Sequence, residues 1–94
     1  MNLVIEIPST TSVEIELPLL VKHKDYEEYL KITNDLKLVR VFMSKDIYSS
    51  ITFERLDKDK GTATLKSYYY NREQFIPCTH QEFEDAVNKV LVSL

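Results

Sequence analysis

Two ranges near the start of the chain have hydrophobic patterns that predict β-strands. Residues 3–7 are mostly apolar, and in residues 12–17 Val13, Ile15 and Leu17 alternate with polar residues. A β-strand with one buried and one solvated face requires such a period of two. The Pro-Ser-Thr-Thr segment between the ranges is typical of a turn. We therefore expect two strands joined by a turn, and a third strand in the Leu-Leu-Val run that follows them.

Residues 24–36 fit two different patterns. An acidic capping pair is followed by tyrosine and leucine residues at helical spacing, which predicts a helix. The alternative is a hairpin, in which residues 26–33 and 36–43 are strands joined by Asn34 and Asp35. Asn and Asp adopt positive φ more readily than most residues, so they suit a tight loop.

The pairing implied by this loop favours the hairpin. Leu30 would lie opposite Val39, and Ile32 opposite Lys37. A helix would leave Ile32 on its polar side, whereas the hairpin gathers most apolar residues on one face. That face would consist of Tyr26, Leu30, Ile32, Val39, Val41 and Met43. We therefore expect two strands here, with the helix as the alternative.

A second hairpin is predicted further along the chain. Residues 48–56 and 62–70 are expected to be strands, and they flank a polar loop that ends at Gly61. Glycine provides the left-handed conformation that a short loop needs near its end. The pairs expected on one face are Tyr48 with Tyr70, and Ser50 with Tyr68.

The strongest local signal lies at the end of the chain. Thr79 and Glu82 form a capping box, in which each side chain bonds the backbone amide of the other residue. Cys78 and Phe83 occupy the two positions of a hydrophobic staple. An amphipathic helix is therefore predicted from this point onward. Its apolar stripe would contain Phe83, Ala86, Val87, Val90, Leu91 and Leu94.

Together these elements predict an α+β fold, with an antiparallel β-meander sheet and one C-terminal amphipathic helix packed on one face. The chain has 94 residues, 44% of them hydrophobic and 29% charged, so residues 1–94 are expected to form a single domain. Antiparallel sheets often leave one face in water. Since one helix covers only one face, the other face should be solvated or covered by a partner.

Charge and composition narrow the range of functions. Fifteen acidic and twelve basic residues give a net charge of −3, which disfavours binding by broad neutralisation of phosphates. One glycine excludes Gly-rich phosphate loops, and one cysteine excludes an internal disulfide or a Cys-x-x-Cys metal site. The N-terminus has no basic signal region, and no apolar run approaches a membrane span. We therefore expect no membrane contact and a reducing location, either the cytoplasm or the interior of a virus particle.

No group of residues predicts catalysis or a bound metal. Cys78, His80 and Glu84 lie close together in the sequence, but a zinc site normally takes four donors. The loop at residues 57–61 has the spacing of a fragment of a calcium loop, without the remaining ligands. The start of a helix favours a thiolate at Cys78, yet no second member of a nucleophilic site is in view. We therefore expect a non-enzymatic protein without a cofactor.

The run of three tyrosines is the feature that suggests a function. It lies between Lys66 and Arg72, and alternation would place Tyr68 and Tyr70 beside Tyr48 on the sheet face away from the helix. Tyrosine provides a large contact area and is enriched at the centres of interfaces. The expected interface therefore consists of Tyr48, Lys66, Tyr68, Tyr70 and Arg72.

Three interpretations of this surface stand beside one another. In the first, it binds a protein partner or a second copy of the chain, so the protein is an adaptor, an inhibitor or an assembly component. In the second, the rings stack on the bases of single-stranded nucleic acid while the two cations hold phosphates. The acidic net charge makes nucleic acid the less favoured partner. In the third, the tyrosines belong to a second core beneath residues 1–20.

Overall fold

The computed structural model describes residues 2–6, 12–44, 49–56 and 63–93. Within these ranges the chain forms an antiparallel sheet of five strands, a separate sheet of two strands, and two α-helices. The second of the two helices is C-terminal. The predicted α+β class, with an antiparallel sheet and a C-terminal helix, is therefore confirmed.

The strands come first along the chain and the helices follow. In chain order the elements are β1 (Asn2–Glu6), β2 (Ser12–Glu16), β3 (Leu19–His23), β4 (Glu27–Ile32), β5 (Lys37–Met43), β6 (Ser49–Arg55), α1 (Ala63–Tyr70), the 3₁₀ turn η1 (Arg72–Gln74), β7 (Phe75–Pro77) and α2 (His80–Ser93). β1 pairs with β2, and the larger sheet has the order β6-β5-β4-β3-β7. The meander therefore runs from β3 to β6, and β7 joins it on the other side of β3.

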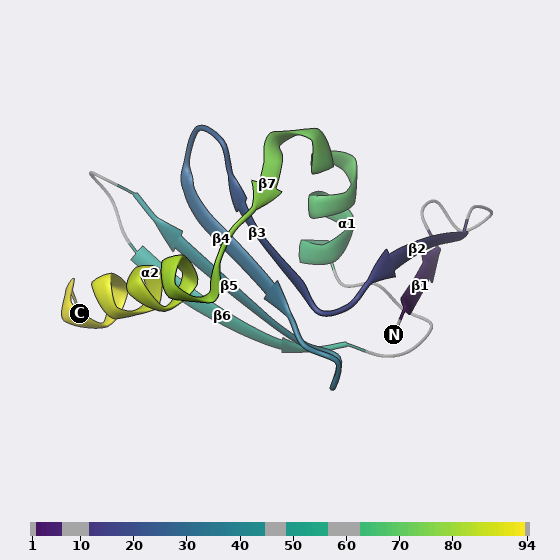
Figure 1. Cartoon of the computed structure of the whole chain (residues 1–94), viewed down its shortest axis with the longest axis horizontal. Helices are drawn as coiled ribbons and strands as arrows, with labels where there is room; N and C mark the ends of the chain where they lie inside the picture. The colour runs from purple at the N-terminus through teal and green to yellow at the C-terminus, as the bar shows by residue number, and fades with distance from the viewer. Residues whose placement is uncertain (1, 7–11, 45–48, 57–62, 94) are drawn as a thin grey trace.

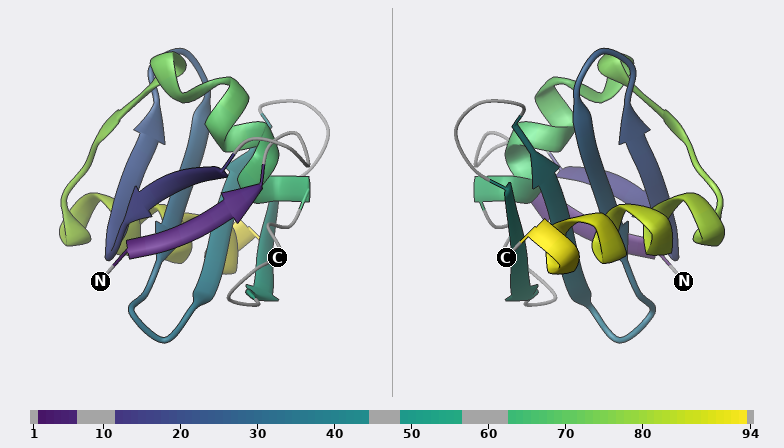
Figure 2. Two further views of the ribbon diagram at one scale, coloured as in Figure 1. Left: turned by 90° about the vertical axis from the view of Figure 1, so that its right-hand side faces the viewer. Right: turned by 90° about the vertical axis from the view of Figure 1, so that its left-hand side faces the viewer.

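The five-stranded sheet is covered on both faces. α2 crosses one face, while α1 and the β1–β2 hairpin lie on the other, as Figures 1 and 2 show. The core on the α2 side consists of Val41, Phe83, Ala86 and Val90. The core on the α1 side consists of Leu3, Ile5, Ile15, Leu17, Val21, Leu30, Ile32, Leu38, Leu56 and Leu65. The expectation of a solvated or partner-covered second face is therefore wrong, because segments of the same chain cover it.

The β4–β5 hairpin is confirmed, and the helix alternative for residues 24–36 is wrong. The register differs from the predicted one by one residue. Leu30 lies opposite Arg40, and Ile32 lies opposite Leu38.

A longer loop explains the shift in register. Leu36 adopts a positive φ of 60°, and its amide donates to the carbonyl of Thr33 at 3.1 Å. Because side chains alternate along a strand, the predicted single apolar face is divided between the two faces of the sheet. Leu30, Ile32 and Leu38 belong to the α1 side, whereas Val39, Val41 and Met43 belong to the α2 side.

The predicted strand at residues 62–70 is wrong, because Ala63–Tyr70 is helical. Leu65 is fully buried in the core on the α1 side, and Tyr68 and Tyr69 pack against that core. These positions are three and four residues apart, so they share one face of a helix but not one face of a strand. Burial of this face outweighs the β-propensity of the tyrosines, which is a weak and context-dependent preference.

Of the pairs predicted across that hairpin, the one between Ser50 and Tyr68 does not form. Ser50, expected opposite Tyr68, pairs with Phe42 of β5. Tyr48 and the loop at residues 57–61 lie outside the described residues. β6 itself is confirmed as a strand, but it stands at the edge of the sheet.

The C-terminal helix and its capping box are confirmed. The Glu82 amide donates to the Thr79 hydroxyl at 3.1 Å, and the Thr79 amide donates to the Glu82 carboxylate at 3.2 Å. Lys22 of β3 forms an ion pair with Glu82 and so links the start of α2 to the sheet. Leu91 is 56% exposed, so its place in the predicted apolar stripe is wrong. Leu94 lies outside the described residues.

Candidate functional site

The tyrosines of the predicted interface lie on α1 and not on a sheet face. Tyr68 is half-buried, its ring meets Phe75 edge to face at a centroid distance of 5.2 Å, and burial raises the pKa of its hydroxyl. Tyr70 is 63% exposed. Tyr68 therefore contributes to the second core, as the third interpretation of the tyrosines expected, while Tyr70 points toward solvent.

Lys66 and Arg72 were predicted to lie at the rim of an aromatic patch on a sheet face, and they do not lie on a sheet face. Lys66 is an exposed residue of α1. The Arg72 guanidinium lies 4.3 Å from the centre of the Tyr69 ring, and its Nη1 donates to the Tyr69 carbonyl at 2.9 Å. Arg72, the first residue of η1, is thus engaged with the C-terminal end of α1. The structure brings Lys66, Tyr68 and Tyr70 onto one short helix but does not join them to a row of sheet residues.

Cys78, His80 and Glu84, which were considered for metal binding, lie at the start of α2. No group of three His, Cys, Asp or Glu side chains in the described part of the chain is arranged to hold a metal ion. Cys78 is half-buried, and this burial raises the pKa of its thiol, with the Glu82 carboxylate acting in the same direction. Burial therefore opposes the thiolate that the start of α2 favours at Cys78. His80 is exposed.

An apolar groove lies beside α2 at the β6 edge of the sheet. It has a volume of about 520 Å³, and its apolar lining includes Val39, Ile51, Phe53, Phe83 and Val87. We call it the β6 groove. Phe53 is 74% exposed, whereas Phe83 of α2 is buried. α2 therefore covers this face of the sheet incompletely and leaves an aromatic ring in solvent.

The backbone of β6 is also open on its outer side, where the sheet has no further strand among the described residues. The Leu56 amide donates to the Leu36 carbonyl at 2.7 Å, which continues the β5–β6 register by one residue. In an antiparallel ladder, successive residues direct their backbone groups alternately toward and away from the neighbouring strand. Even-numbered residues of β6 therefore face β5, and Ile51, Phe53 and Arg55 direct their N–H and C=O groups outward.

The rim of the β6 groove is basic. Lys37 and Arg55 are exposed and lie directly opposite each other in the β5–β6 pairing. Lys31 completes the rim, with its amine 5.8 Å from the centre of the Phe83 ring. Like charges directly opposite each other destabilise a sheet. Neither Lys37 nor Arg55 forms an ion pair with a described carboxylate. The Glu54 carboxylate also lines the groove and accepts a hydrogen bond from the Thr64 hydroxyl. The groove therefore combines exposed apolar side chains with two exposed basic residues.

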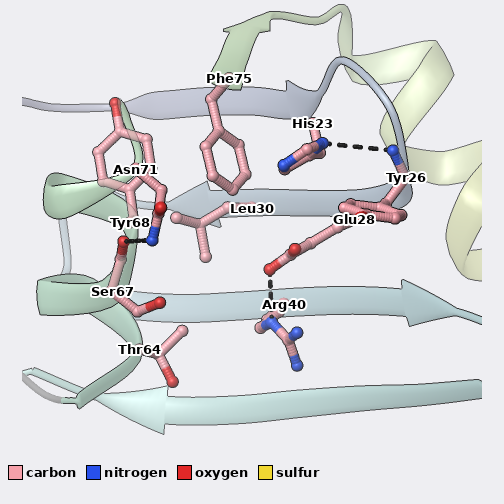
Figure 3. Close-up of a pocket in the computed structure, with 10 residues that line it drawn as sticks. All are labelled: His23, Tyr26, Glu28, Leu30, Arg40, Thr64, Ser67, Tyr68, Asn71 and Phe75. Atoms are coloured by element: carbon pink, nitrogen blue, oxygen red, sulfur yellow. Dashed lines mark hydrogen bonds and ion pairs between the residues drawn. The ribbon is translucent and has the colours of Figure 1, made fainter. Parts of the chain in front are cut away.

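A second hollow lies on the other face of the sheet, between α1 and the loop that joins β3 to β4 (Figure 3). We call it the α1 pocket, and its volume is about 500 Å³. Aromatic side chains follow one another along one side, in the order Tyr68, Phe75, His23 and Tyr26. The opposite side is polar and includes Glu28, Arg40, Thr64 and Ser67.

The polar side of the α1 pocket contains an ion pair between Arg40 and Glu28. The predicted register of β4 against β5 does not place these two side chains on the same face. The Arg40 Nε donates to the Glu28 carboxylate at 2.9 Å. Glu28 is two residues from Leu30 along β4, and Leu30 lies opposite Arg40, so all three side chains share one face. In the predicted register Glu28 faces Val41 instead. No signal in the sequence predicted the contact between Glu28 and Arg40, because only the observed register brings the two side chains together.

Comparison with known proteins identifies no relative of this chain, since no family model, no curated protein and no solved structure matches it. No helix in the described ranges is both long and apolar enough to cross a membrane.

Proposed function

We propose that this chain is a non-enzymatic protein-binding module that adds an extended segment of a partner protein to the β6 edge. The observation that carries the proposal is Phe53, a large aromatic side chain that is 74% exposed on β6, whose outer side pairs with no other described strand. Long apolar edge strands are usually shortened, charged or covered, because they pair readily with other chains. Binding of an extended peptide at a sheet edge uses main-chain hydrogen bonds for affinity and alternate side chains for specificity.

The side chains beside the edge define what such a segment should contain. Residues of an added strand that lie opposite Ile51, Phe53 and Arg55 would point to the groove face, because directly paired residues share a face. Apolar residues suit the positions opposite Ile51 and Phe53. An acidic residue suits the position opposite Arg55, because oppositely charged residues that are directly paired stabilise a sheet. For an antiparallel segment, this gives the pattern acidic-x-apolar-x-apolar.

A second copy of the chain fits this edge less well. A two-fold arrangement centred on Thr52 would pair Ile51 with Phe53 of the other copy, which is compatible with the outward backbone groups. It would also pair Arg55 with Ser49, so it would bring no carboxylate to Arg55. We therefore favour a different protein as the partner, in a reducing setting such as the cytoplasm, where the free Cys78 thiol stays reduced.

The nucleic-acid alternative loses the arrangement that suggested it. That arrangement was a row of Tyr48, Tyr68 and Tyr70 on two paired strands, and Tyr68 and Tyr70 are instead helical. A contact role for Lys66, Tyr70 and Arg72 stays a prediction. Salt separates the two alternatives, since binding through phosphate contacts weakens steeply as salt rises, whereas apolar binding at an edge does not.

The proposal is tested with a displayed library of short random peptides selected against the wild-type protein. We expect enrichment of peptides with the acidic-x-apolar-x-apolar pattern. Binding of an enriched peptide should weaken about tenfold or more in Phe53→Ser, as for a central interface residue. Val92→Ser is the matched control, because Val92 is 88% exposed on α2 and lies outside the groove.

Charge reversal provides the second arm of the experiment. Arg55→Glu should reject the selected acidic peptides and accept versions with lysine at the acidic position. If no peptide is enriched, or if enriched peptides bind Phe53→Ser as tightly as wild type, the β6 edge is not the binding surface.

A further inference from the structure

The α1 pocket is independent of the β6 edge, since it lies on the opposite face of the sheet and shares no lining residue with the β6 groove. Its volume of about 500 Å³ falls in the range of ligand pockets, roughly 300–1,000 Å³. We propose that the α1 pocket binds a small planar heteroaromatic molecule with neighbouring hydrogen-bond donors and acceptors on one edge, the chemistry of a nucleobase.

The aromatic side of the pocket supplies a surface for a flat ring. Phe75 stands at the middle of the row, with ring centroids 5.2 Å from Tyr68 and 5.2 Å from His23. The row continues to Tyr26, whose ring is 4.8 Å from that of His23. These rings meet at an angle and so hold one another in place without stacking face to face. Because no two of these rings stack face to face, a flat ligand can stack on their faces.

His23 presents a fixed donor at the end of this row. Its Nδ1 accepts hydrogen bonds from the backbone amides of Asp25 at 3.0 Å and Tyr26 at 3.3 Å. A nitrogen that accepts carries no proton, so in the neutral imidazole the proton is on Nε2. Nε2 points into the α1 pocket in Figure 3.

The polar side of the pocket offers donors and acceptors side by side. Arg40 uses Nε for its bond to Glu28, and its two terminal nitrogens have no hydrogen-bond partner among the described residues. Glu28 likewise engages one carboxylate oxygen and leaves the other as an acceptor. The Ser67 hydroxyl adds a group that both donates and accepts.

The charge balance favours a neutral ligand over a simple anion. The charge of Arg40 is already matched by Glu28, so a carboxylate placed beside Arg40 would be repelled by Glu28. A nucleobase edge instead carries amino, carbonyl and ring-nitrogen groups within one plane. Such an edge can accept from Arg40 and donate to Glu28 at the same time, while its face stacks on the aromatic side.

The test titrates adenosine, guanosine, cytidine and uridine, each with the full chain, and detects binding by saturation-transfer NMR. Benzoate serves as a flat anionic comparator. We expect at least one nucleoside to bind, to shift the resonances of His23 and Arg40, and to bind more tightly than benzoate. Failure of all four nucleosides, or tighter binding of benzoate, would overturn the proposal.

Two variants locate the site. Phe75→Leu should weaken binding about tenfold by removing the stacking surface. Glu28→Gln keeps the shape but removes a charged acceptor and should also weaken binding about tenfold. Tyr70→Leu is the matched control, because Tyr70 is an exposed ring at the end of α1 outside the pocket. Equal binding by wild type and Glu28→Gln would overturn the proposal, even if Phe75→Leu failed to fold.

Discussion

The two faces of the five-stranded sheet are covered by helices that the sequence specifies in different ways. α2 has a capping box and an apolar stripe, so it is specified by local signals that act within a few residues. α1 has no acidic residue in its first turn and no basic residue in its last turn, and it contains three consecutive tyrosines. Its helical form follows from the burial of Leu65, Tyr68 and Tyr69 against distant strands.

The comparison also shows where the surface is left open. The core on the α2 side is small, and it ends at the β6 groove, where Phe53 remains in solvent. The core on the α1 side is larger because the β1–β2 hairpin adds residues such as Leu3 and Ile5 to it. It leaves the α1 pocket where α1 does not reach the β3–β4 loop. The β6 groove therefore lies beyond the part of the sheet that α2 covers, and the α1 pocket lies beyond the part that α1 covers.

The largest expected effect is on the α2 face. Phe83→Ala removes a ring that is 5% exposed and should lower the free energy of unfolding by about 3–5 kcal/mol. Leu91→Ala, on the exposed side of the same helix, should change it by less than about 0.5 kcal/mol. Urea denaturation of both variants measures the difference. Equal effects would mean that α2 does not pack on the sheet through Phe83.

The α1 face should respond less strongly. Leu65→Ala deletes a smaller side chain that is fully buried, and it should cost about 2–4 kcal/mol. Tyr70→Ala, on the same helix but 63% exposed, is the control and should be nearly neutral. Amide hydrogen exchange should show α1 losing protection in Leu65→Ala while α2 keeps it. A cross-strand contact between residues 62–70 and β6 in NMR spectra would instead restore the predicted hairpin.

The smallest expected effect is the pH dependence of the ion pair that links α2 to β3. The hydrogen bond from Lys22 lowers the pKa of Glu82 below 4.5, and the same bond raises the pKa of Lys22 above 10.5. A lowered carboxyl pKa contributes stability that is complete above 4.5 and is lost as the pH falls through the folded value. A raised amine pKa contributes stability that is complete below 10.5 and is lost as the pH rises through the folded value.

Denaturation of wild type and Glu82→Gln at several pH values measures this contribution. The gap between the two proteins should be present at neutral pH and should close below pH 4.5. Glu84→Gln, at an exposed position of the same helix, is the control. A gap that persists at low pH would mean that Glu82 acts through packing and not through its charge.

Local sequence signals determined the elements that depend on neighbouring residues. The alternation around Val13 and Ile15 predicted β2, and the capping residues Thr79 and Glu82 predicted the start of α2. In each case the pattern spans a few positions. It predicts the element and its apolar face, without specifying which residues that face packs against. The α+β class followed from these elements, because strands followed by an amphipathic helix leave few other arrangements.

Only the tertiary structure decided the register of β4 against β5, the helical form of α1 and the two candidate surfaces. A positive φ at Leu36 moved the register by one residue, and that shift placed Glu28 beside Arg40. Leu65 made α1 a helix because its burial involves strands far away in the sequence. Faces and edges are properties of paired strands, so the open edge at Phe53 exists only once the order of the strands is known.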